Sequence, residues 1–549
     1  RQAGDLLHSL RINALPILDR GEVVGLISRQ DVDSAHRHGL DDRPVSEFAV
    51  AKPAWVKPSA SLSEVRRVML SNHGRLLMVG DPKSGPIGVL TRSSVFRAWA
   101  GDPRLAGTRR APNRNQVLKD IEAVLGDSWE YVQRAAQVAE SADLVLHLVG
   151  GTVRDVLTHS PTRDIDLVVE GDAVTLVNAI VEQVGGSAKV HETFHTARWM
   201  TPAGQAIDFA SARTEFYATP AALPTVTQAG LRQDLHRRDF TINAMAISLK
   251  PDELGTVIDP FGGLADLKDG VIRVLHGLSF HDDPTRAWRA ARFAARFEFD
   301  ISEDSLGLMR SARRVGVFDG LGIERLGHEL DLILDELQVE RCFRLIRNWD
   351  LAQYIHSSLK IEREWLGDLA TAQSVWQRFQ AYESSRGHRQ SDALWIIVGK
   401  ALEPAVRDSI SRLVPGPTKR TRLFVEGPEV TRQTLNKVSQ AVRQAARDAS
   451  TNLRADVAEA LAELTFPERV IAFSLADVEP AELIEWWERD GREVKTDVDG
   501  DFLIAQGYQP GPDFRPAIRA AQRVAWAGGA AEEQAQAAFE AMQPRARKS

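Results

Sequence analysis

Two short stretches decide the fold of this chain. The first is Leu144-Val-Leu-His-Leu-Val-Gly150-Gly151-Thr-Val-Arg154-Asp155, and the second is Arg163-Asp164-Ile-Asp166-Leu-Val-Val-Glu170. In the first, an apolar strand ends in two glycines and a short helix follows, so backbone amides and the helix N-terminus can approach an anion closely. In the second, period-two geometry places two carboxylates on one face of a strand. Together they predict a strand–turn–helix–strand unit with a phosphate-binding turn.

The carboxylate pair predicts a metal centre. Asp164 and Asp166 repel each other unless a cation lies between them. Hard oxygen ligands that leave positions for water and phosphate suit Mg²⁺. A third carboxylate is expected on a neighbouring strand, and Ala206-Ile-Asp208-Phe-Ala210 supplies one. Three carboxylates with two Mg²⁺ ions form a device for in-line attack of a hydroxyl on an α-phosphate, so Asp164, Asp166 and Asp208 are the candidate metal ligands and catalytic residues.

Two further motifs offer contacts for a nucleotide. The stretch Asp234-Leu-His-Arg-Arg238-Asp239-Phe-Thr-Ile-Asn243 supplies a cation, an acceptor and an amide that suit triphosphate and ribose. The stretch Asp282-Asp283-Pro-Thr-Arg286 is expected to open a helix, with Pro284 in its first turn. On that helix Asp283 and Arg286 are i,i+3 neighbours that can pair and present a hydrogen-bonding edge.

The whole set of motifs resembles the class II tRNA nucleotidyltransferase and bacterial poly(A) polymerase family, from about residue 145 to the end of the chain. The motifs, in family order, are Gly150-Gly-Thr-Val-Arg154-Asp155, Asp164-Ile-Asp166, Arg237-Arg-Asp-Phe-Thr-Ile-Asn243-Ala, Asp259-Pro-Phe-Gly-Gly263, Asp282-Asp-Pro-Thr-Arg286 and Ile323-Glu324-Arg325. The resemblance implies an α+β, polymerase-beta-like nucleotidyltransferase head with a mostly helical neck, body and tail.

The resemblance also implies roles for the residues of these motifs. Asp164 and Asp166, with Asp208, would hold two Mg²⁺ ions. The nucleotide would be bound by Gly150, Gly151, Arg154, Arg238, Asp239 and Asn243, and its base would be read by Asp283 and Arg286. Asp282 stands where the family pattern has Glu. The implied reaction adds CCA, or the terminal A, to tRNA 3′ ends from CTP and ATP and releases pyrophosphate.

Several activities stay open at this point. The segment Ala212–Val226 resembles the family's flexible loop at full length, and this disfavours addition of CC alone. Addition of CCA, of A only, or of poly(A) to RNA 3′ ends remains. A small-molecule nucleotidyltransferase and a nucleotide sensor with an inactive head are more remote alternatives.

The first hundred residues contain an imperfect repeat. Gly25-Leu-Ile-Ser28-Arg-Gln-Asp31-Val aligns with Gly88-Val-Leu-Thr91-Arg-Ser-Ser94-Val. Each copy reads as a strand followed by a residue that can cap a helix. The repeat resembles a tandem α/β CBS-domain pair with a shortened first copy. In that family a Ser/Thr-x-x-Asp grips the ribose of an adenine nucleotide, so Ser28 and Asp31 could bind one. The other interpretation is a purely structural pair, and a homodimer through it is expected.

The chain divides by pattern into six segments. We expect the CBS pair at 1–100, a linker and a helix (about 117–138) at 101–140, the catalytic head at 141–265, a helical neck at 266–335, an RNA-binding helical body at 336–450 and a helical tail at 451–549. Residues 405–450 hold nine Lys or Arg against four acidic residues, whereas 451–510 hold five against fourteen. Lys419, Arg420 and Arg422 are therefore candidate RNA contacts, and 451–510 is expected to be a solvated acidic segment.

Composition excludes several classes of protein. The net charge of -7 argues against general coating of nucleic acid, and the one cysteine, Cys342, excludes a disulfide framework. No apolar run approaches the ~18 residues of a membrane helix, so no membrane partner is expected. A reducing, cytoplasmic location follows. The chain begins with Arg1, so we expect it to be a piece of something longer, in which a targeting signal could precede it.

Overall fold

The computed structural model divides the chain into two compact units, residues 1–321 and 322–549. It describes the chain apart from residues 1, 10–13, 21, 49–53, 62–63, 66–67, 69–75, 83, 92–111, 163, 193–194, 217–224, 383–384, 449–451 and 543–549. The linker expected at 101–115 lies mostly outside the described residues. The boundary between the units falls inside the segment expected to be a single neck. No helix in the described part of the chain combines the length and the apolar character needed to cross a membrane.

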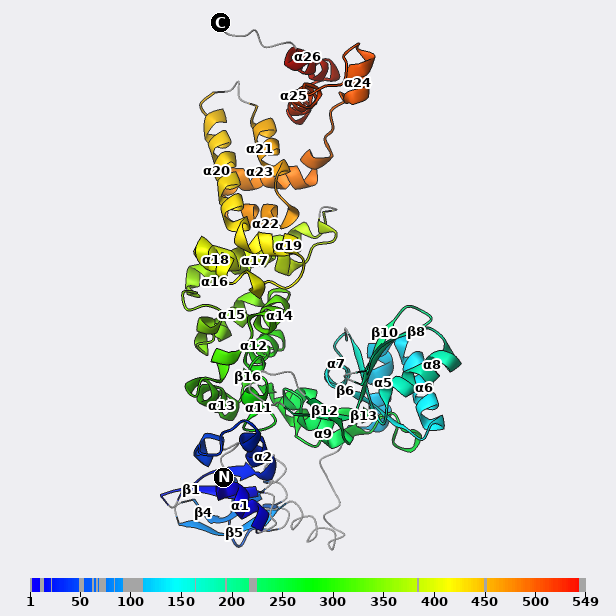
Figure 1. The fold of residues 1–549 in the computed structure, drawn as a ribbon, viewed down its shortest axis with the longest axis vertical. Helices are drawn as coiled ribbons and strands as arrows, with labels where there is room; N and C mark the ends of the chain where they lie inside the picture. Colours follow the sequence, from blue (N-terminus) through cyan, green and yellow to red (C-terminus); the bar gives the residue numbers. More distant parts are fainter. Residues whose placement is uncertain are drawn as a thin grey trace. The chain divides into compact units, whose positions relative to one another are not determined.

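A seven-stranded mixed sheet forms the centre of the head (Figure 1). Its strands, in spatial order, are β14 (Val257–Ile258), β13 (Ala246–Ser248), β6 (Val145–Val149), β7 (Ile165–Glu170), β10 (Ala206–Ser211), β9 (Thr196–Met200) and β8 (Ser187–His191). The strands β7 and β10 are parallel, and their other neighbours in the sheet run antiparallel. The two strands predicted from the sequence, β6 and β7, are present, and the structure shows that they pair with each other inside this sheet.

The two faces of the sheet have different roles. Ile165, Leu167, Ile207 and Phe209 are buried in one hydrophobic cluster with the helices α5 (Arg114–Leu125), α6 (Ser128–Ser141) and α8 (Ala173–Val184). Alternation along a strand then places Asp166 and Asp208 on the opposite face. Burial of the odd-numbered residues therefore fixes which face carries the carboxylates.

The helix expected over 117–138 is wrong as a single element. The structure has α5 and α6 instead, and they are separated at Gly126. Gly126 has φ +52°, a conformation that glycine adopts without the steric cost of a Cβ. The chain therefore ends one helix at this glycine and begins another, so that both can cover the sheet.

The N-terminal module contains α1 (Gln2–Ser9), β1 (Ala14–Asp19), β2 (Glu22–Ser28), α2 (Arg29–Arg37), a short 3-10 turn at Val45–Phe48, β3 (Ala54–Val56), β4 (Leu76–Asp81) and β5 (Gly85–Thr91). The antiparallel pairs β1–β2 and β4–β5 correspond to the two repeat copies. Leu26 of the first copy and Leu76 and Met78 of the second share one small core. The two copies of the sequence repeat therefore form two similar strand pairs that pack against each other.

The remaining elements of the first unit are mainly helical. The elements are β11 (Arg213–Phe216), β12 (Thr225–Gln228), α7 (Gly151–Leu157), α9 (Leu231–His236), the 3-10 turn Thr241–Asn243, a second 3-10 turn at Pro251–Glu253, α10 (Gly263–Asp269), β15 (Val271–Ile272), α11 (Ser279–Asp282), α12 (Arg286–Arg296), β16 (Asp300–Ile301), α13 (Glu303–Arg314) and a 3-10 turn at Val317–Gly320. The expected single helix through Asp283 and Arg286 is wrong. Asp283 is extended (φ -140°, ψ 100°), and α12 begins only at Arg286.

The second unit is helical throughout its described residues. Its α-helices are α14 (Ile323–Leu334), α15 (Val339–Asn348), α16 (Arg363–Phe379), α17 (Gln390–Lys400), α18 (Pro404–Ser409), α19 (Thr418–Val425), α20 (Gly427–Ala445), α21 (Leu453–Ala462), α22 (Phe466–Ser474), α23 (Val478–Arg489), α24 (Gly500–Ala505), α25 (Phe514–Trp526) and α26 (Ala531–Met542). Short 3-10 turns lie at Ala352–Tyr354, Ser411–Leu413 and Gly491–Glu493.

The segment 451–510 is less solvated than its charge suggests. Glu488 is buried and receives a hydrogen bond from Arg469. Glu468 is buried and completes a capping box with Thr465 at the start of α22. Pairing removes the penalty of burying these carboxylates. The expectation of a wholly solvated acidic segment is therefore wrong.

Candidate active site

The three candidate carboxylates lie at one place on the central sheet. Asp208 of β10 is the register partner of Asp166 of β7, and Asp164 immediately precedes β7. Thr152 of α7 fixes the start of β7, because its hydroxyl donates to the Asp164 carbonyl (3.1 Å) and accepts from the Asp166 amide (2.9 Å). The glycine turn and the carboxylates are therefore held together by one side chain.

Asp166 has a raised pKa. Burial raises its pKa, Arg238 opposes that shift, and the negative charges of Asp208 and Asp164 add to it. Like charges held on neighbouring strands raise the free energy of the ionised state. A cation at this point would relieve that repulsion.

Asp208 faces a different partner. Arg198 of β9 donates to it with two parallel hydrogen bonds, Nε to Oδ1 (2.7 Å) and Nη2 to Oδ2 (2.6 Å). Such a bidentate pair fixes the plane of the carboxylate. Sequence analysis missed Arg198, although the antiparallel pairing of β9 with β10 opposes it to Asp208.

The donor set suits Mg²⁺ in chemistry. It is composed of carboxylate oxygens, which are hard ligands, on adjoining strands. Among the described residues no group of three or more His, Cys, Asp or Glu side chains already has the arrangement of metal ligands. Both Asp208 oxygens accept a hydrogen bond from Arg198. The donor atoms of these residues therefore suit a divalent ion, and Arg198 is the cation that would compete with such an ion for Asp208.

Gly150 and Arg238 touch each other beside the carboxylates. Gly150 has φ +68°, and a Cβ on it would lie 2.6 Å from Arg238 Nη1 and 3.7 Å from Asp166 Oδ2. Arg238 Nη2 donates to the wholly buried Asp234 (3.0 Å), which Arg237 also contacts (2.7 Å). Burial would raise the pKa of Asp234, but these two arginines lower it overall. Asp234 thus fixes Arg238 against the glycine turn.

Arg154, Asp239 and Asn243 form a buried network behind the turn. Arg154 pairs with Asp155 (2.7 Å), donates to Asn243 Oδ1 (2.7 Å) and stacks 4.6 Å from the Phe297 ring. Asn243 in turn donates to Asp239 (3.0 Å). Arg154 is therefore buried, and its guanidinium fixes the Asn243 side chain while it pairs with Asp155.

Asp239 ties this network to α12. It accepts from Arg289 through Nη2 (2.6 Å) and Nε (3.0 Å). Burial would raise its pKa, but Arg289 and the Asn243 hydrogen bond outweigh burial and lower it. Asp239 is therefore an ionised acceptor that joins two of the nucleotide motifs.

Asp283 and Arg286 lie at the bend between α11 and α12. Asp283 accepts from the Thr285 hydroxyl (2.6 Å) and amide (3.0 Å). Arg286 is buried, and it donates to the carbonyls of Ser279 (3.2 Å) and Arg237 (2.6 Å). The side chain of Arg286 is thus fixed by the start of α11 and by the residue before Arg238.

A cleft of about 550 Å³ opens beside the carboxylates. Its polar walls come from β7, β8, β9, β10 and the end of α9: Asp166, Lys189, His191, Thr196, Arg198, Asp208, Arg237 and Arg238. This volume is in the range of small-ligand sites. The β8 residues Lys189 and His191 are not predicted from the sequence, because four of the five residues of β8 are exposed and one is half-buried, so the strand carries no alternating pattern.

The loop expected over Ala212–Val226 is described only at its ends. There β11 and β12 pair antiparallel, with Arg213 opposite Gln228 and Phe216 opposite Thr225. Residues 217–224 lie outside the described part of the chain.

Ser28 and Asp31 cap a helix in the N-terminal module. The Asp31 carboxylate accepts from the Ser28 amide (2.8 Å) and hydroxyl (2.5 Å), and the Ser28 hydroxyl accepts from the Asp31 amide (3.2 Å). This reciprocal capping box satisfies the first turn of α2, and Asp31 is buried. These two side chains therefore hold the start of α2, and binding of an adenine nucleotide by them stays a prediction.

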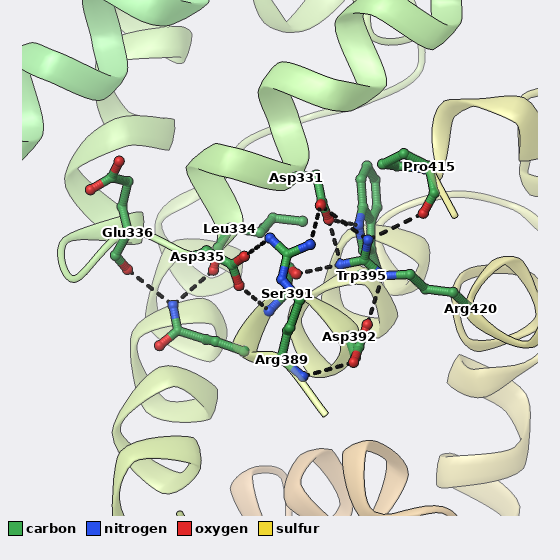
Figure 2. Close-up of polar contacts among 11 residues, drawn as sticks. Asp331, Leu334, Asp335, Glu336, Arg389, Ser391, Asp392, Trp395, Pro415 and Arg420 are labelled. Carbon is green, nitrogen blue, oxygen red and sulfur yellow. Dashed lines mark hydrogen bonds and ion pairs between the residues drawn. The ribbon is translucent and has the colours of Figure 1, made fainter. Parts of the chain in front are cut away.

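The candidate RNA contacts separate into two kinds. Arg420 is buried, so its expected place on an exposed RNA-binding surface is wrong. Figure 2 shows its guanidinium directed into the protein, toward Asp331 (3.0 Å), Asp392 (2.6 Å) and the Pro415 carbonyl (3.1 Å). Lys419 and Arg422 are exposed, and Arg422 pairs with Glu426 one turn away (2.7 Å).

Family models match two segments of the chain. Residues 146–273 match the poly A polymerase head domain, and residues 45–101 match the CBS domain. The second match covers only the second copy of the N-terminal repeat.

Curated relatives extend the similarity to most of the chain. The A-adding tRNA nucleotidyltransferase of Geobacter sulfurreducens is 32% identical over 534 residues, which are 94% of this chain and 59% of that protein. The A-adding tRNA nucleotidyltransferase of Halalkalibacterium halodurans is 42% identical over 38% of this chain and 50% of its own length. The chain thus spans about half the length of these relatives.

Solved structures share the fold. A CCA-adding enzyme in an apo form superposes with a TM-score of 0.64 at 25% identity, over 78% of this chain and 99% of that chain. A tRNA nucleotidyltransferase complexed with a primer tRNA and an incoming ATP analog gives a TM-score of 0.55 at 29% identity, over 66% and 99%. Segments of the chain therefore match the poly A polymerase head domain and the CBS domain, and the chain resembles a tRNA nucleotidyltransferase over nearly its whole length.

Proposed function

We propose that the protein is a tRNA nucleotidyltransferase that adds the terminal A to tRNA 3′ ends. The observation that carries the proposal is the pairing of Asp166 with Asp208 on adjacent parallel strands, with Arg238 beside Gly150 at the same edge. Negative groups for a cation and a positive group for phosphate then lie around one cleft. This is the arrangement that transfer of a nucleotidyl group requires.

In the proposed reaction the 3′-hydroxyl of the RNA attacks the α-phosphorus of ATP. The bond from the 3′-oxygen to phosphorus forms, the bond from that phosphorus to the β-phosphate oxygen breaks, and pyrophosphate leaves. The hydroxyl proton passes to solvent. Asp164, Asp166 and Asp208 would hold two Mg²⁺ ions, which when bound lower the hydroxyl pKa and neutralise phosphate charge. Arg238 would neutralise the triphosphate from the Gly150 side.

The choice of A is supported by the relatives. The Geobacter relative that aligns with 94% of this chain is an A-adding enzyme, as are those from Halalkalibacterium halodurans and Aquifex aeolicus. The CC-adding tRNA nucleotidyltransferase of Deinococcus radiodurans aligns with 38%. Asp283 and Arg286 would read the base. Complete CCA addition, with CTP as a second substrate, and poly(A) synthesis are the competing activities.

The partners in this proposal are the 3′ end of tRNA and ATP, in the cytoplasm where tRNA matures. Lys419 and Arg422 would contact the RNA backbone.

Self-association through the N-terminal module is a further part of the proposal, supported by exposed Leu18 and Ile87 on β1 and β5. A monomer by light scattering at micromolar concentration would contradict that part.

The proposal is tested by transfer of radiolabelled AMP from α-labelled ATP to tRNA that ends in CC. Wild type should label the RNA and release pyrophosphate. Asp164→Ala and Asp166→Ala should lose incorporation by at least about 1,000-fold while far-UV circular dichroism and melting are retained. Incorporation by either variant at the wild-type rate would reject the proposed site.

A further inference from the structure

The N-terminal module makes a polar contact with the bend that holds Asp283 and Arg286. Asp282, the last residue of α11, accepts a hydrogen bond from His38 Nε2 (2.8 Å), although 244 residues separate them. Ser34 on α2 donates to the same oxygen (3.3 Å). The His38 side chain is 1% exposed and that of Asp282 is 15% exposed. The contact is therefore an enclosed one.

The ionisation state of Asp282 determines which of the two side chains, His38 or Asp282, donates the hydrogen bond. Burial would raise the pKa of Asp282, but His38, His276 and Arg286 outweigh it and lower the pKa to about 2. Asp282 is thus ionised at neutral pH and can only accept hydrogen bonds. His38 must donate from Nε2, and loss of this donor would leave a largely buried carboxylate with fewer partners.

Apolar packing holds the same interface. Leu278, beside α11, is wholly buried in one cluster with Ile17, Ile27 and Phe48 of the N-terminal module. The Phe48 ring also packs edge-on against His281 of α11 (5.8 Å). The N-terminal module thus contacts α11 and the residue before it through apolar packing and through a hydrogen bond.

Two contacts lead from α11 to the nucleotide motifs. Arg286 is held by the carbonyl of Ser279, the first residue of α11. Asp282 Oδ2 lies 3.4 Å from His276 Nε2, and the His276 ring stacks on His236 (5.0 Å between centroids, 16° between planes). His236 ends α9, two residues before Arg238. A shift of α11 would therefore move both Arg286 and the support of Arg238.

We propose that His38 is a positioning residue for reading the nucleobase, so that the N-terminal module completes the nucleotide site of the head. His38 sets the position of α11 through Asp282, and α11 sets Arg286. The inference rests on the proposed function for the identity of the nucleotides, and it deepens it by assigning nucleotide selectivity partly to a residue outside the catalytic head. Selectivity for ATP over CTP depends on a fixed hydrogen-bonding edge, so a loosened bend reduces it.

The test compares His38→Ala with two matched variants in the full chain. His38→Gln keeps a donor near the position of Nε2. His36→Ala changes the same helix at an exposed histidine that pairs with Asp41. The readouts are calorimetric dissociation constants for ATP and for CTP without RNA, and then kcat and KM for each nucleotide on tRNA ending in CC.

His38→Ala should lower the ATP-to-CTP preference about 10-fold, the size expected for loss of one charge-assisted hydrogen bond, mainly by weakening ATP binding and raising its KM. His38→Gln should restore most of the preference, and His36→Ala should match wild type. An unchanged preference in His38→Ala, or no rescue by His38→Gln, overturns the inference. If His38→Ala does not fold, Ser34→Ala takes its place. Ser34→Ala should reduce the ATP-to-CTP preference by less than about 10-fold, and an unchanged preference in this variant would overturn the inference.

The two proposals fail in different ways. A wild-type protein that adds no nucleotide to RNA rejects the proposed function. The binding preference of wild type, His38→Ala and His38→Gln still decides the role of His38. If wild type adds A to tRNA and its preference does not depend on His38, only the inference fails.

Discussion

At the residue scale, neighbouring carboxylates of the site are balanced by different means. Asp166 lies among like charges with a raised pKa, whereas Asp208 is neutralised by Arg198. The difference arises from the strand order, since β10 lies between β7 and β9. Burial, with the nearby charges of Asp208 and Asp164, therefore disfavours the ionised form of Asp166, whereas Asp208 is engaged by a cation.

Asp166→Asn should stabilise the metal-free protein at neutral pH. The raised folded-state pKa means that Asp166 contributes stability below its unfolded pKa and that this contribution is lost as pH rises through the folded pKa. The amide carries no charge and loses nothing over that window. Melting temperature against pH without divalent ions measures this. A variant that melts lower than wild type at pH 7–8 would contradict the account of Asp166.

Arg198→Ala should lower the Mg²⁺ concentration needed to stabilise the protein. The substitution removes the cation that competes for Asp208. One exposed ion pair is worth about 0.5–1 kcal/mol, so the midpoint should fall roughly 2- to 5-fold. Melting temperature against Mg²⁺ concentration reports this without turnover. Lys189→Ala, which removes another cation of the same cleft, is the control. A higher midpoint in Arg198→Ala would show that Arg198 does not compete for Asp208.

The sequence predicts some site residues better than others. Alternation in Ala206–Ala210 correctly predicts that Asp208 faces away from the core. The sequence does not predict the roles of Arg198 and Asp234 or the burial of Arg420. These roles depend on the contacts that the side chains make in the folded protein and on burial. A charged residue in a basic stretch reads as exposed unless its buried acidic partners are known.

At the element scale, the turn between β6 and α7 depends on one glycine more than on the other. Gly150 needs its positive φ, and its missing Cβ leaves room for Arg238. Gly151 has no such constraint, since a Cβ there would meet Arg154 Nη2 at 3.5 Å, an ordinary contact.

Gly150→Ala should therefore cost more stability than Gly151→Ala. A positive φ on alanine costs about 1–3 kcal/mol, and the displaced Arg238 adds to it. Urea unfolding of both variants measures the difference. Equal stabilities would show that the turn is not held in this conformation.

Element boundaries were less predictable than element types. Glycine pairs and apolar periodicity predict β6, β7 and the repeat in the N-terminal module. The bend at Asp283 is missed, because Pro284 reads equally as the first turn of one helix or as the end of another. Asp282, beside the bend, contacts His38 at the end of α2, and no local pattern in the sequence encodes a contact between residues so far apart.

At the scale of the whole molecule, each unit has its own polar anchor. In the first unit Asp282 joins the N-terminal module to α11. In the second, Arg420 joins α19 to α14 and α17 through Asp331 and Asp392 (Figure 2). The net charge of residues 405–450 is therefore larger than the charge that this segment exposes, because Arg420 is buried.

Arg420→Glu should destabilise the second unit, because a buried carboxylate would face Asp331 and Asp392. Breaking a buried ion pair costs about 3–5 kcal/mol. Lys419→Glu and Arg422→Glu should leave unfolding unchanged and instead weaken tRNA binding at low salt, with a shallower salt dependence. Denaturant unfolding and binding titrations separate these effects. If Arg420→Glu unfolds like Lys419→Glu, the buried network is not formed.

The central claim is that the whole chain adds one A to a tRNA that ends in CC. The most direct measurement supplies tRNAs that end before C74, before A76, or complete, with ATP, CTP or both, and resolves product lengths. We expect extension by one nucleotide, from ATP alone, on the tRNA that lacks only A76. Extension of the shorter tRNA by three nucleotides with both substrates, or a long A tract on any of the tRNAs, would contradict the claim.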